Sequence, residues 1–221
     1  MRINKFVAQA TGLSRRAADR AIQDNRITIN QRPASVGDNI DDEDIVQLDG
    51  KFITAAPNEL TIMLNKPVGY VCSREGQGSQ TVYDLLPAEY HQLKPVGRLD
   101  KDSSGLLLLT NNGDLANQLT HPSYAKPKVY EITLDKPLDP NDKARIDQGV
   151  QIDDYLSRLQ LVQADNQVWQ VTMSQGRNRQ IRRTFDALGY TVRTLHRTGF
   201  GPYSLANLQP GKYLSLPNLL K

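Results

Sequence analysis

The sequence is poor in cysteine, with Cys72 alone among its 221 residues. A single cysteine cannot form a disulfide within the chain, which is typical of proteins in a reducing compartment. Long apolar runs are also missing, because no stretch approaches the roughly 18 residues that a membrane-spanning helix needs. The first residues contain no apolar stretch followed by a small-residue cleavage site, as a secretory signal would. We therefore expect a cytoplasmic protein without a membrane partner.

Histidine is scarce as well. The three histidines, His91, His121 and His196, are scattered along the chain and do not have the spacing of zinc ligands. The glycine pattern G-x-G-x-x-G, with which many proteins bind nicotinamide or flavin cofactors, is not found. We therefore expect neither a metal nor a cofactor.

Charge is spread unevenly, although the formal net charge is only +3. Residues 1–33 hold seven basic residues against two acidic ones, and residues 34–58 hold one against six. Residues 174–197 hold six basic residues against one acidic residue. Two separated basic segments are expected in a protein that contacts a phosphate backbone. The alternative is that both are ordinary solvated helix faces.

A short acidic turn precedes the most apolar part of the chain. Residues 97–100 read Gly-Arg-Leu-Asp, and four consecutive leucines follow at 106–109. Because that run must be buried, the turn lies at the edge of a core and Asp100 is a positioned carboxylate. Three interpretations compete: a polar turn, a calcium loop and a catalytic carboxylate. Asp100 and Asp102 fit the first half of a calcium loop, but Asn111 stands where its bidentate Glu should be.

Residues 1–55 have the pattern of a small accessory binding unit. Apolar residues recur at helical spacing over 3–10, Gly12 ends this helix, and Ser14 is suited to cap a second helix. Arginines at 15 and 16 fall in the first turn of that helix, where cations oppose its dipole, so a phosphate partner is indicated. Short strands are expected at 27–29 and 44–48.

The remainder of the chain, residues 60–221, predicts a larger α+β domain. Residues 54–58 are small, polar and contain a proline, so we expect them to link the two domains. Because strands and helices do not alternate strictly, we expect a mixed, mainly antiparallel sheet flanked by helices. The expected strands are 60–64, 106–110, 129–134, 159–163, 168–173, 191–195 and 213–216. The expected helices are 114–121, 141–148 and 178–188.

Two segments of the larger domain could act with Asp100. Alternation over 128–134 places Tyr130 on one face of a strand, either as a core aromatic or as part of a site. Residues 175–183 carry four arginines, and only Asp186 lies nearby to neutralise them. A salt-bridged surface helix is the alternative, but an anionic partner fits better.

Residues 1–55 resemble the S4-type RNA-binding domain. The resemblance rests on Arg2-Ile3-Asn4-Lys5-Phe6, Gly12-Leu13-Ser14-Arg15-Arg16, Ala18-Asp19 and Ile27-Thr28-Ile29-Asn30. It implies that two helices contact structured RNA. The RNA contacts expected in this domain are Arg2, Lys5, Arg15, Arg16 and Arg20.

The whole chain resembles the pseudouridine synthases that act on ribosomal RNA and carry an S4-type domain. The motifs are Asn65-Lys66-Pro67-Val68-Gly69, 97–110, Gly113-Asp114-Leu115, His121-Pro122-Ser123, Lys128-Val129-Tyr130, 176–183 and Leu195-His196-Arg197. Departures from the pattern are Ser174-Gln175, where relatives often have an acidic residue, and Thr184, where they often have methionine. Both lie beside the site and affect the expected substrate more than the reaction.

The resemblance implies a role for each matched residue. Asp100 is the expected catalytic aspartate, Arg182 its ion-pair partner, and Tyr130 the aromatic that stacks on a flipped-out target base. Leu195 is the expected apolar wall of the pocket. Further substrate contacts are expected from Arg98, Leu99, Lys101, Arg177, Asn178, Arg179 and Gln180.

We therefore expect a cofactor-independent isomerase that converts uridine to pseudouridine, since rejoining the base to the ribose through carbon involves no redox step. The expected partner is RNA, either ribosomal RNA or a ribosome assembly intermediate, and not DNA, and the expected state is a monomer. The alternative is a non-catalytic RNA-binding or ribosome-assembly protein. Against it stands the full set of Asp100, Tyr130 and Arg182, which a protein without activity could lose freely.

Overall fold

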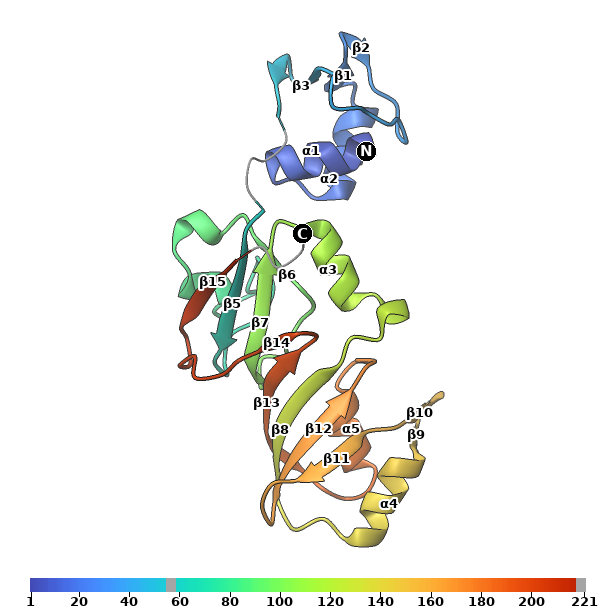
Figure 1. Ribbon diagram of the computed structural model, residues 1–221, viewed down its shortest axis with the longest axis vertical. Helices are drawn as coiled ribbons and strands as arrows, with labels where there is room; N and C mark the ends of the chain where they lie inside the picture. The colour runs from blue at the N-terminus through green and yellow to red at the C-terminus, as the bar shows by residue number, and fades with distance from the viewer. Residues whose placement is uncertain (55–58, 218–221) are drawn as a thin grey trace. The chain divides into compact units, whose positions relative to one another are not determined.

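The computed structural model describes residues 1–54 and 59–217. The pattern of contacts divides the chain into two compact units, Met1–Leu60 and Thr61–Lys221, which are coloured along the chain in Figure 1. Each unit is described by itself. Most of the expected linker, at residues 55–58, lies outside the described residues.

The first unit contains two helices and a four-stranded antiparallel sheet in the order β2-β1-β3-β4. Ser14 caps the second helix, because its hydroxyl accepts a hydrogen bond of 3.1 Å from the amide of Ala17. Gly12 ends the first helix in the left-handed region, at φ 76°. Both predictions are confirmed. The elements are α1 (Ile3–Thr11), α2 (Arg15–Gln23), β1 (Ile27–Ile29), β2 (Arg32–Pro33), β3 (Val46–Leu48) and β4 (Lys51–Phe52).

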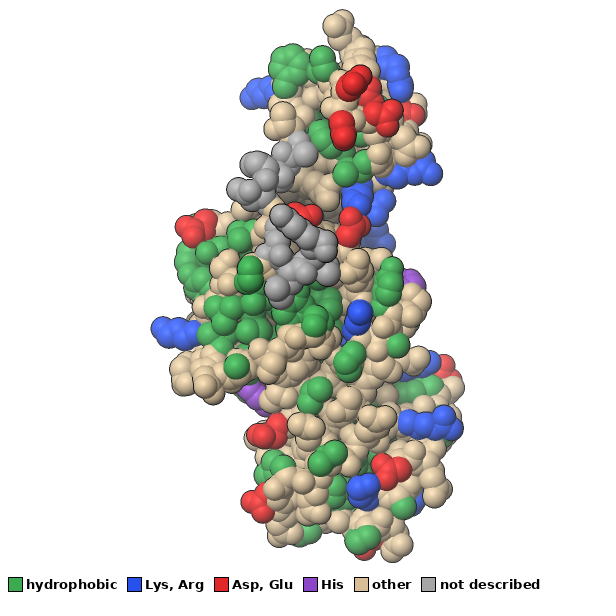
Figure 2. All heavy atoms as spheres, viewed as in Figure 1, with side chains coloured by type: hydrophobic (Ala, Val, Ile, Leu, Met, Phe, Trp, Pro, Cys, Tyr) green, Lys and Arg blue, Asp and Glu red, His purple; other side chains and the backbone are tan. Residues whose placement is uncertain are grey.

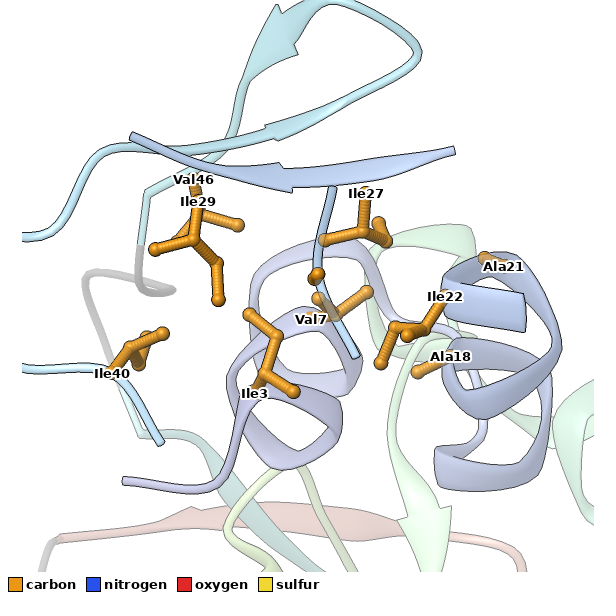
Figure 3. Close-up of a cluster of buried hydrophobic side chains, with 10 residues drawn as sticks. Ile3, Val7, Ala18, Ala21, Ile22, Ile27, Ile29, Ile40 and Val46 are labelled. Carbon is orange, nitrogen blue, oxygen red and sulfur yellow. The ribbon is translucent and has the colours of Figure 1, made fainter. Parts of the chain in front are cut away.

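The core of this unit lies between the helices and the sheet. Ile3 and Val7 of α1, Ile22 of α2 and Ile27 of β1 are at most 2% exposed and point toward one another (Figure 3). Burying these apolar faces leaves the charged faces to solvent. Figure 2 shows acidic side chains of this unit gathered in one group with basic side chains around it. Of the cations expected to bind RNA, Lys5 is half-buried and the others are exposed: Arg2, Arg15, Arg16 and Arg20.

The larger unit is built on a nine-stranded sheet whose main path runs β11-β12-β8-β13-β7-β5-β15. Among the described strands, β13 and β7 form the single parallel pair, and the others pair antiparallel, which confirms the expected mixed sheet. The strands are β5 (Thr61–Lys66), β6 (Lys94–Pro95), β7 (Ser104–Thr110), β8 (Lys128–Leu134), β11 (Gln160–Gln163), β12 (Val168–Met173), β13 (Val192–Phe200), β14 (Tyr203–Ser204) and β15 (Tyr213–Leu216).

The helices of the larger unit are short and lie outside the sheet (Figure 1). They are α3 (Gly113–Thr120), α4 (Pro140–Gln148), α5 (Gln180–Asp186) and the 3-10 turns η1 (Val82–Leu85), η2 (Ala88–Tyr90) and η3 (Pro122–Tyr124). Leu115 and Leu119 of α3 pack on Leu106 and Leu108 of β7. No helix among the described residues combines the length and apolar character needed to cross a bilayer.

Three differences from the expected elements bear on the site. The helix expected at 178–188 begins only at Gln180, because Arg179 has a left-handed backbone with φ 48°. The strand expected at 191–195 continues to Phe200, with register shifts at two points. A two-stranded hairpin, β9 (Val150–Ile152) and β10 (Tyr155–Ser157), was not expected.

Candidate active site

A cavity of about 640 Å³ opens in the larger unit, where β8 and β13 meet the turn before β7 and the segment before α5. The turn contributes residues 97–100 and the segment contributes residues 173–181. Most residues expected at the site line this cavity: Arg98, Leu99, Asp100, Tyr130, Arg177, Asn178, Arg179, Gln180 and Leu195. Two others, Lys101 and Arg182, do not line it.

The Asp100 turn is fixed from below by a buried lysine at the end of β5. Lys66 has no exposed surface, and its Nζ donates hydrogen bonds to the carbonyls of Asp100 (3.1 Å), Ser103 (2.7 Å) and Pro67 (3.0 Å). Burial lowers the pKa of the Lys66 ammonium, and the Asp100 and Asp102 carboxylates partly oppose that shift. The backbone of the turn is therefore held in place by hydrogen bonds from a buried cation.

Two further contacts from the same segment hold the turn in place. The amide of Gly69 donates to the carbonyl of Lys101 over 2.8 Å. The thiol of Cys72 lies 3.3 Å from the carbonyl and 3.4 Å from the amide of Leu99, and burial raises its pKa. Asp100 is thus a positioned carboxylate, as its place before the four leucines predicts.

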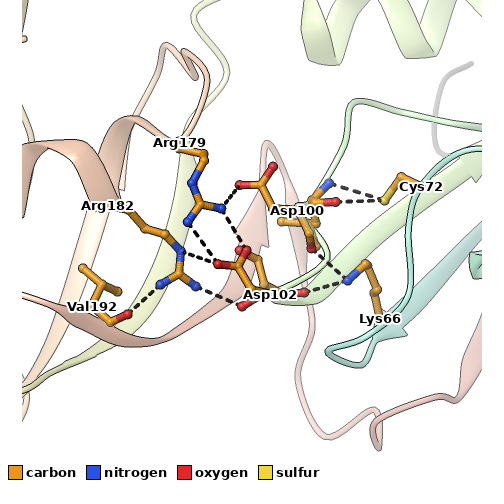
Figure 4. A network of polar contacts seen from close by, with 9 residues as sticks. Lys66, Cys72, Asp100, Asp102, Arg179, Arg182 and Val192 are labelled. Atoms are coloured by element: carbon orange, nitrogen blue, oxygen red, sulfur yellow. Dashed lines mark hydrogen bonds and ion pairs between the residues drawn. The ribbon is translucent and has the colours of Figure 1, made fainter. Parts of the chain in front are cut away.

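The carboxylate of Asp100 faces an arginine from the segment before α5. Arg179 Nη1 lies 3.6 Å from Asp100 Oδ2, and both side chains are about two-fifths exposed, at 42% and 41%. The same guanidinium donates a pair of hydrogen bonds, each 3.1 Å long, to the two carboxylate oxygens of Asp102. Asp102 therefore holds Arg179 at a fixed distance from Asp100 (Figure 4).

The expected ion pair between Asp100 and Arg182 is not formed. Arg182 Nε instead lies 3.3 Å from Asp102 Oδ2, and its Nη groups donate to the carbonyls of Asp102 (2.9 Å) and Val192 (2.5 Å). The reason is geometric. Arg182 lies about one helical turn after Arg179, and from there its guanidinium reaches Asp102 instead of Asp100. Arg182 connects α5, β13 and the Asp102 loop, and Arg179 is the partner of Asp100 (Figure 4).

The floor of the cavity is a stretch of β8 and β13. Tyr130 and Leu195 are 7% and 8% exposed and both line the cavity. Arg197 lies directly opposite Tyr130 in the register of the two strands. Because cross-strand neighbours and residues two apart share a face, Tyr130, Leu195 and Arg197 lie on the same side of the sheet. An aromatic ring and an apolar side chain there can hold a planar base.

The mouth of the cavity is basic. Arg98, Arg177 and Arg179 are exposed at its rim. Arg177 lies over the ring of Tyr155, 4.2 Å from its centroid, and 3.9 Å from Asp154 of the hairpin. Lys101, which does not line the cavity, donates to Ser79 Oγ over 3.0 Å. Among the charged residues that line the cavity, five are basic and one is acidic, so it favours a polyanion.

Several residues of the site were not predicted from the sequence. Lys66 and Arg197 belong to motifs noted there, but nothing in their neighbourhoods signals that both would be buried. Asp102 was assigned only to the calcium interpretation. The four arginines at 177–183 were the signal that could have identified Asp102. They have only Asp186 nearby in sequence, so they need carboxylate partners from other parts of the chain. The site residues that were missed are Lys66, Asp102, Ser103, Lys128 and Arg197.

Asp102→Asn should weaken the larger unit in a pH-dependent way. Burial raises the pKa of Asp102, but the hydrogen bonds of Arg179 and the charges of Arg182 and Arg179 outweigh it, so the pKa lies below its ordinary 3.8. A depressed pKa gives stability that is present above about pH 4 and lost as the pH falls through the native pKa. Because Asp102 is half exposed, we expect about 1 kcal/mol, or 2–4 °C.

The measurement is the melting temperature of wild type and Asp102→Asn between pH 7 and pH 2.5. The gap between them should be full at pH 6 and should close in acid, where protonated Asp102 resembles Asn. A gap of constant size would mean that the charge of Asp102 contributes nothing.

Two family models match the chain. The model described as RNA pseudouridylate synthase matches residues 60–187, and the model described as S4 domain matches residues 1–46. These ranges fall within the larger and the smaller unit, respectively, apart from residue 60 at the boundary.

Similar proteins extend over nearly the whole chain. An uncharacterized RNA pseudouridine synthase of Aquifex aeolicus is 35% identical, over 98% of this chain and 90% of its own. The dual-specificity RNA pseudouridine synthase RluF of Escherichia coli K12 is 35% identical, over 98% and 75%. The ribosomal small subunit pseudouridine synthase A of Salmonella typhimurium is 36% identical, over 98% and 96%. A crystal structure of a pseudouridylate synthase superposes with a TM-score of 0.70 at 32% identity, covering 98% of this chain and 96% of that one.

Proposed function

This chain belongs to the RNA pseudouridylate synthase family and isomerises uridine to pseudouridine in RNA, and we propose that its substrate is ribosomal RNA and its essential carboxylate Asp100. The observation that carries the proposal is the cavity itself. A fixed carboxylate stands on its wall, an aromatic and an apolar side chain form its floor, and arginines surround its mouth. One relative is named a ribosomal small subunit pseudouridine synthase, which supports ribosomal RNA as the substrate class.

The reaction moves the ribose from one ring atom of uracil to another. The C1′–N1 bond breaks and a C1′–C5 bond forms, while C5 loses a proton to solvent and N1 gains one, so atoms and electrons balance. An ionised carboxylate beside C1′ or the ring can act as a nucleophile or stabilise positive charge. Both roles need the negative charge of Asp100, whose Oδ2 lies 3.6 Å from Arg179 Nη1.

The target uridine must leave its helix or loop to reach Asp100. Unstacking costs a few kcal/mol, which stacking on an aromatic side chain offsets in part. Tyr130 is suited to this role, because it lies on the floor with one side toward the cavity. The exposed Arg98, Arg177 and Arg179 are suited to hold the phosphates on either side of the flipped nucleotide.

The larger unit supplies every residue that lines the cavity. We therefore propose that the protein acts as a monomer. Because its proposed substrate is ribosomal RNA, we also propose that it acts in the compartment where ribosomes are made. Sedimentation at the concentrations used for activity should give the mass of one chain. Activity that appears only with a dimer would contradict this part of the proposal.

The proposed function is tested by mapping pseudouridines at nucleotide resolution. Purified protein is incubated with unmodified small-subunit and large-subunit ribosomal RNA transcripts, and RNA from cells with and without the protein is mapped in parallel. One or a few uridines should become pseudouridine in both experiments. If neither ribosomal RNA is modified, the substrate assignment is wrong.

The S4-type unit should supply much of the RNA affinity. We expect the triple variant Arg15→Gln, Arg16→Gln and Arg20→Gln to bind RNA at least about tenfold more weakly at 150 mM salt. The slope of log K against log salt should become less steep by about 0.9 for each phosphate that the variant no longer neutralises. The three side chains are exposed, so folding should be unaffected.

A matched control removes two cations from the exposed face of α4. Lys143 and Arg145 pair there with neighbouring aspartates, and the variant Lys143→Gln, Arg145→Gln should leave the salt slope unchanged. An equal drop in affinity in both variants would mean that net charge, and not the S4-type unit, determines binding.

A further inference from the structure

Two polar groups of the cavity are buried without a partner. Arg197 is 2% exposed and Ser103 is 1% exposed, and both line the cavity. Within the described part of the chain, neither Arg197 Nη2 nor Ser103 Oγ has a hydrogen-bond partner. Buried polar groups are nearly always paired, and an unpaired one destabilises the fold. Because both residues line the cavity, a bound ligand is the candidate partner of both groups.

Other contacts hold the Arg197 guanidinium in place. Its Nε donates to the carbonyl of Leu106 over 2.7 Å, and its guanidinium lies 4.8 Å from the ring centroid of Phe200. At Gly105, which pairs with Arg197, a Cβ atom would come within 2.3 Å of the Arg197 carbonyl. Only glycine permits this approach of β7 to β13. The guanidinium is therefore rigid and preorganised.

Arg197 lies deeper in the cavity than the other arginines that line it. Arg98, Arg177 and Arg179 are exposed at the mouth, where a backbone phosphate can reach them. Arg197 lies on the floor opposite Tyr130, where a stacked base would lie. It forms no ion pair with any carboxylate of the described residues. Its position therefore fits the base and not the phosphate.

Resting on the proposed function, we propose that Arg197 Nη2 and Ser103 Oγ bind the edge of the flipped uracil. Arg197 donates to one of the two carbonyl oxygens that flank N3, and Ser103 accepts from N3–H or donates to the same oxygen. Guanidinium groups only donate, so Arg197 requires an acceptor. Uracil offers acceptor, donor and acceptor along this edge, whereas cytosine offers a donor amine in place of one carbonyl.

Arg197 also stabilises the base after it detaches. When the C1′–N1 bond breaks, its electron pair stays on the ring and the negative charge spreads onto the two carbonyl oxygens. A buried guanidinium beside one of those oxygens binds the detached base more strongly than bound uridine, which lowers the barrier. The charge returns to neutral when C5 bonds to C1′, C5 loses its proton and N1 is protonated.

The test uses an RNA fragment that contains the mapped uridine, under single-turnover conditions, with uridine, 2-thiouridine or 4-thiouridine at that position. On the RNA with uridine, Arg197→Met should turn over about 10²–10³-fold more slowly than wild type, the effect typical of removing one such donor. Its RNA affinity should differ from that of wild type by less than threefold. Sulfur accepts hydrogen bonds poorly. The thio substitution at the carbonyl that Arg197 contacts should therefore slow the wild type more than it slows Arg197→Met. The other thio substitution should slow both proteins equally, so the comparison identifies which carbonyl oxygen Arg197 binds.

Ser103→Ala provides a second variant that should fold normally. It removes an atom without a partner, so its melting temperature should equal or exceed that of wild type while turnover falls about tenfold. Tyr155→Phe is the matched control, because the Tyr155 hydroxyl is also buried without a partner in the described structure but does not line the cavity. Turnover by this variant should match wild type.

The outcomes separate this inference from the proposed function. Failure of wild-type protein to modify any ribosomal RNA overturns the function itself. Turnover by Arg197→Met within threefold of wild type, or equal thio effects in wild type and variant, overturns the role of Arg197 alone. If Arg197→Met does not fold, normal turnover by Ser103→Ala together with equal rates on all three RNAs overturns the inference.

Discussion

Asp100→Asn should lower pseudouridine formation by at least about 10³-fold while RNA affinity and folding remain nearly unchanged. The amide has almost the same shape as the carboxylate but lacks its charge, so it can neither attack as a nucleophile nor stabilise a cation. RNA affinity comes mainly from phosphate contacts made by other residues. Arg179 loses one partner in this variant but keeps its two hydrogen bonds to Asp102, so the melting temperature should fall by no more than about 2 °C.

Asp102→Asn is the natural comparison, because it makes the same chemical change two residues away. It should lower stability more than Asp100→Asn does and should retain measurable turnover, since Asp102 does not line the cavity. The assay is pseudouridine mapping after incubation of each protein with unmodified ribosomal RNA. Substantial turnover by Asp100→Asn would remove this carboxylate from the mechanism.

Lys66→Met should destabilise the larger unit by about 3 kcal/mol, because it leaves three carbonyls without their shared donor. For a unit of this size the melting temperature should fall by about 6–12 °C. Turnover should fall as well, even well below the melting temperature, because two of those carbonyls belong to Asp100 and Ser103. RNA affinity should change little, since Lys66 has no exposed surface.

Lys143→Met is the matched control for this variant. Lys143 pairs with Asp147 on the exposed face of α4 at 2.7 Å, and surface pairs of this kind contribute little. Its melting temperature should stay within about 2 °C of wild type. A similarly small change for Lys66→Met would mean that the turn does not depend on the lysine.

The sequence predicts which segments meet better than it predicts how their side chains pair. The expected strands of the larger unit are all present, because alternation and apolar runs report burial directly. The spacing of Arg179 and Arg182 shows that both lie near the start of one helix, but not which one reaches Asp100. In the structure Arg179 precedes α5 with a left-handed backbone and reaches Asp100, whereas Arg182 reaches Asp102.

Burial of charged residues is the other feature that the sequence does not reveal. Arg197 lies in a segment with several polar neighbours and reads as exposed, yet it is 2% exposed. Its burial follows from the parallel pairing of β13 with β7, which joins residues about ninety positions apart. Local patterns cannot report such a contact, because neither strand alone determines its neighbour.

The pairing of β13 with β7 also determines the stage of protein synthesis at which the active site can form. Asp100 leaves the ribosome early, but the strand that completes the floor of the cavity is Val192–Phe200, close to the end of the chain. Contacts between such distant segments form slowly, because a long loop must close before they can form. The cavity can therefore be completed only after Phe200 has been synthesised, long after the residues of the S4-type unit have been made.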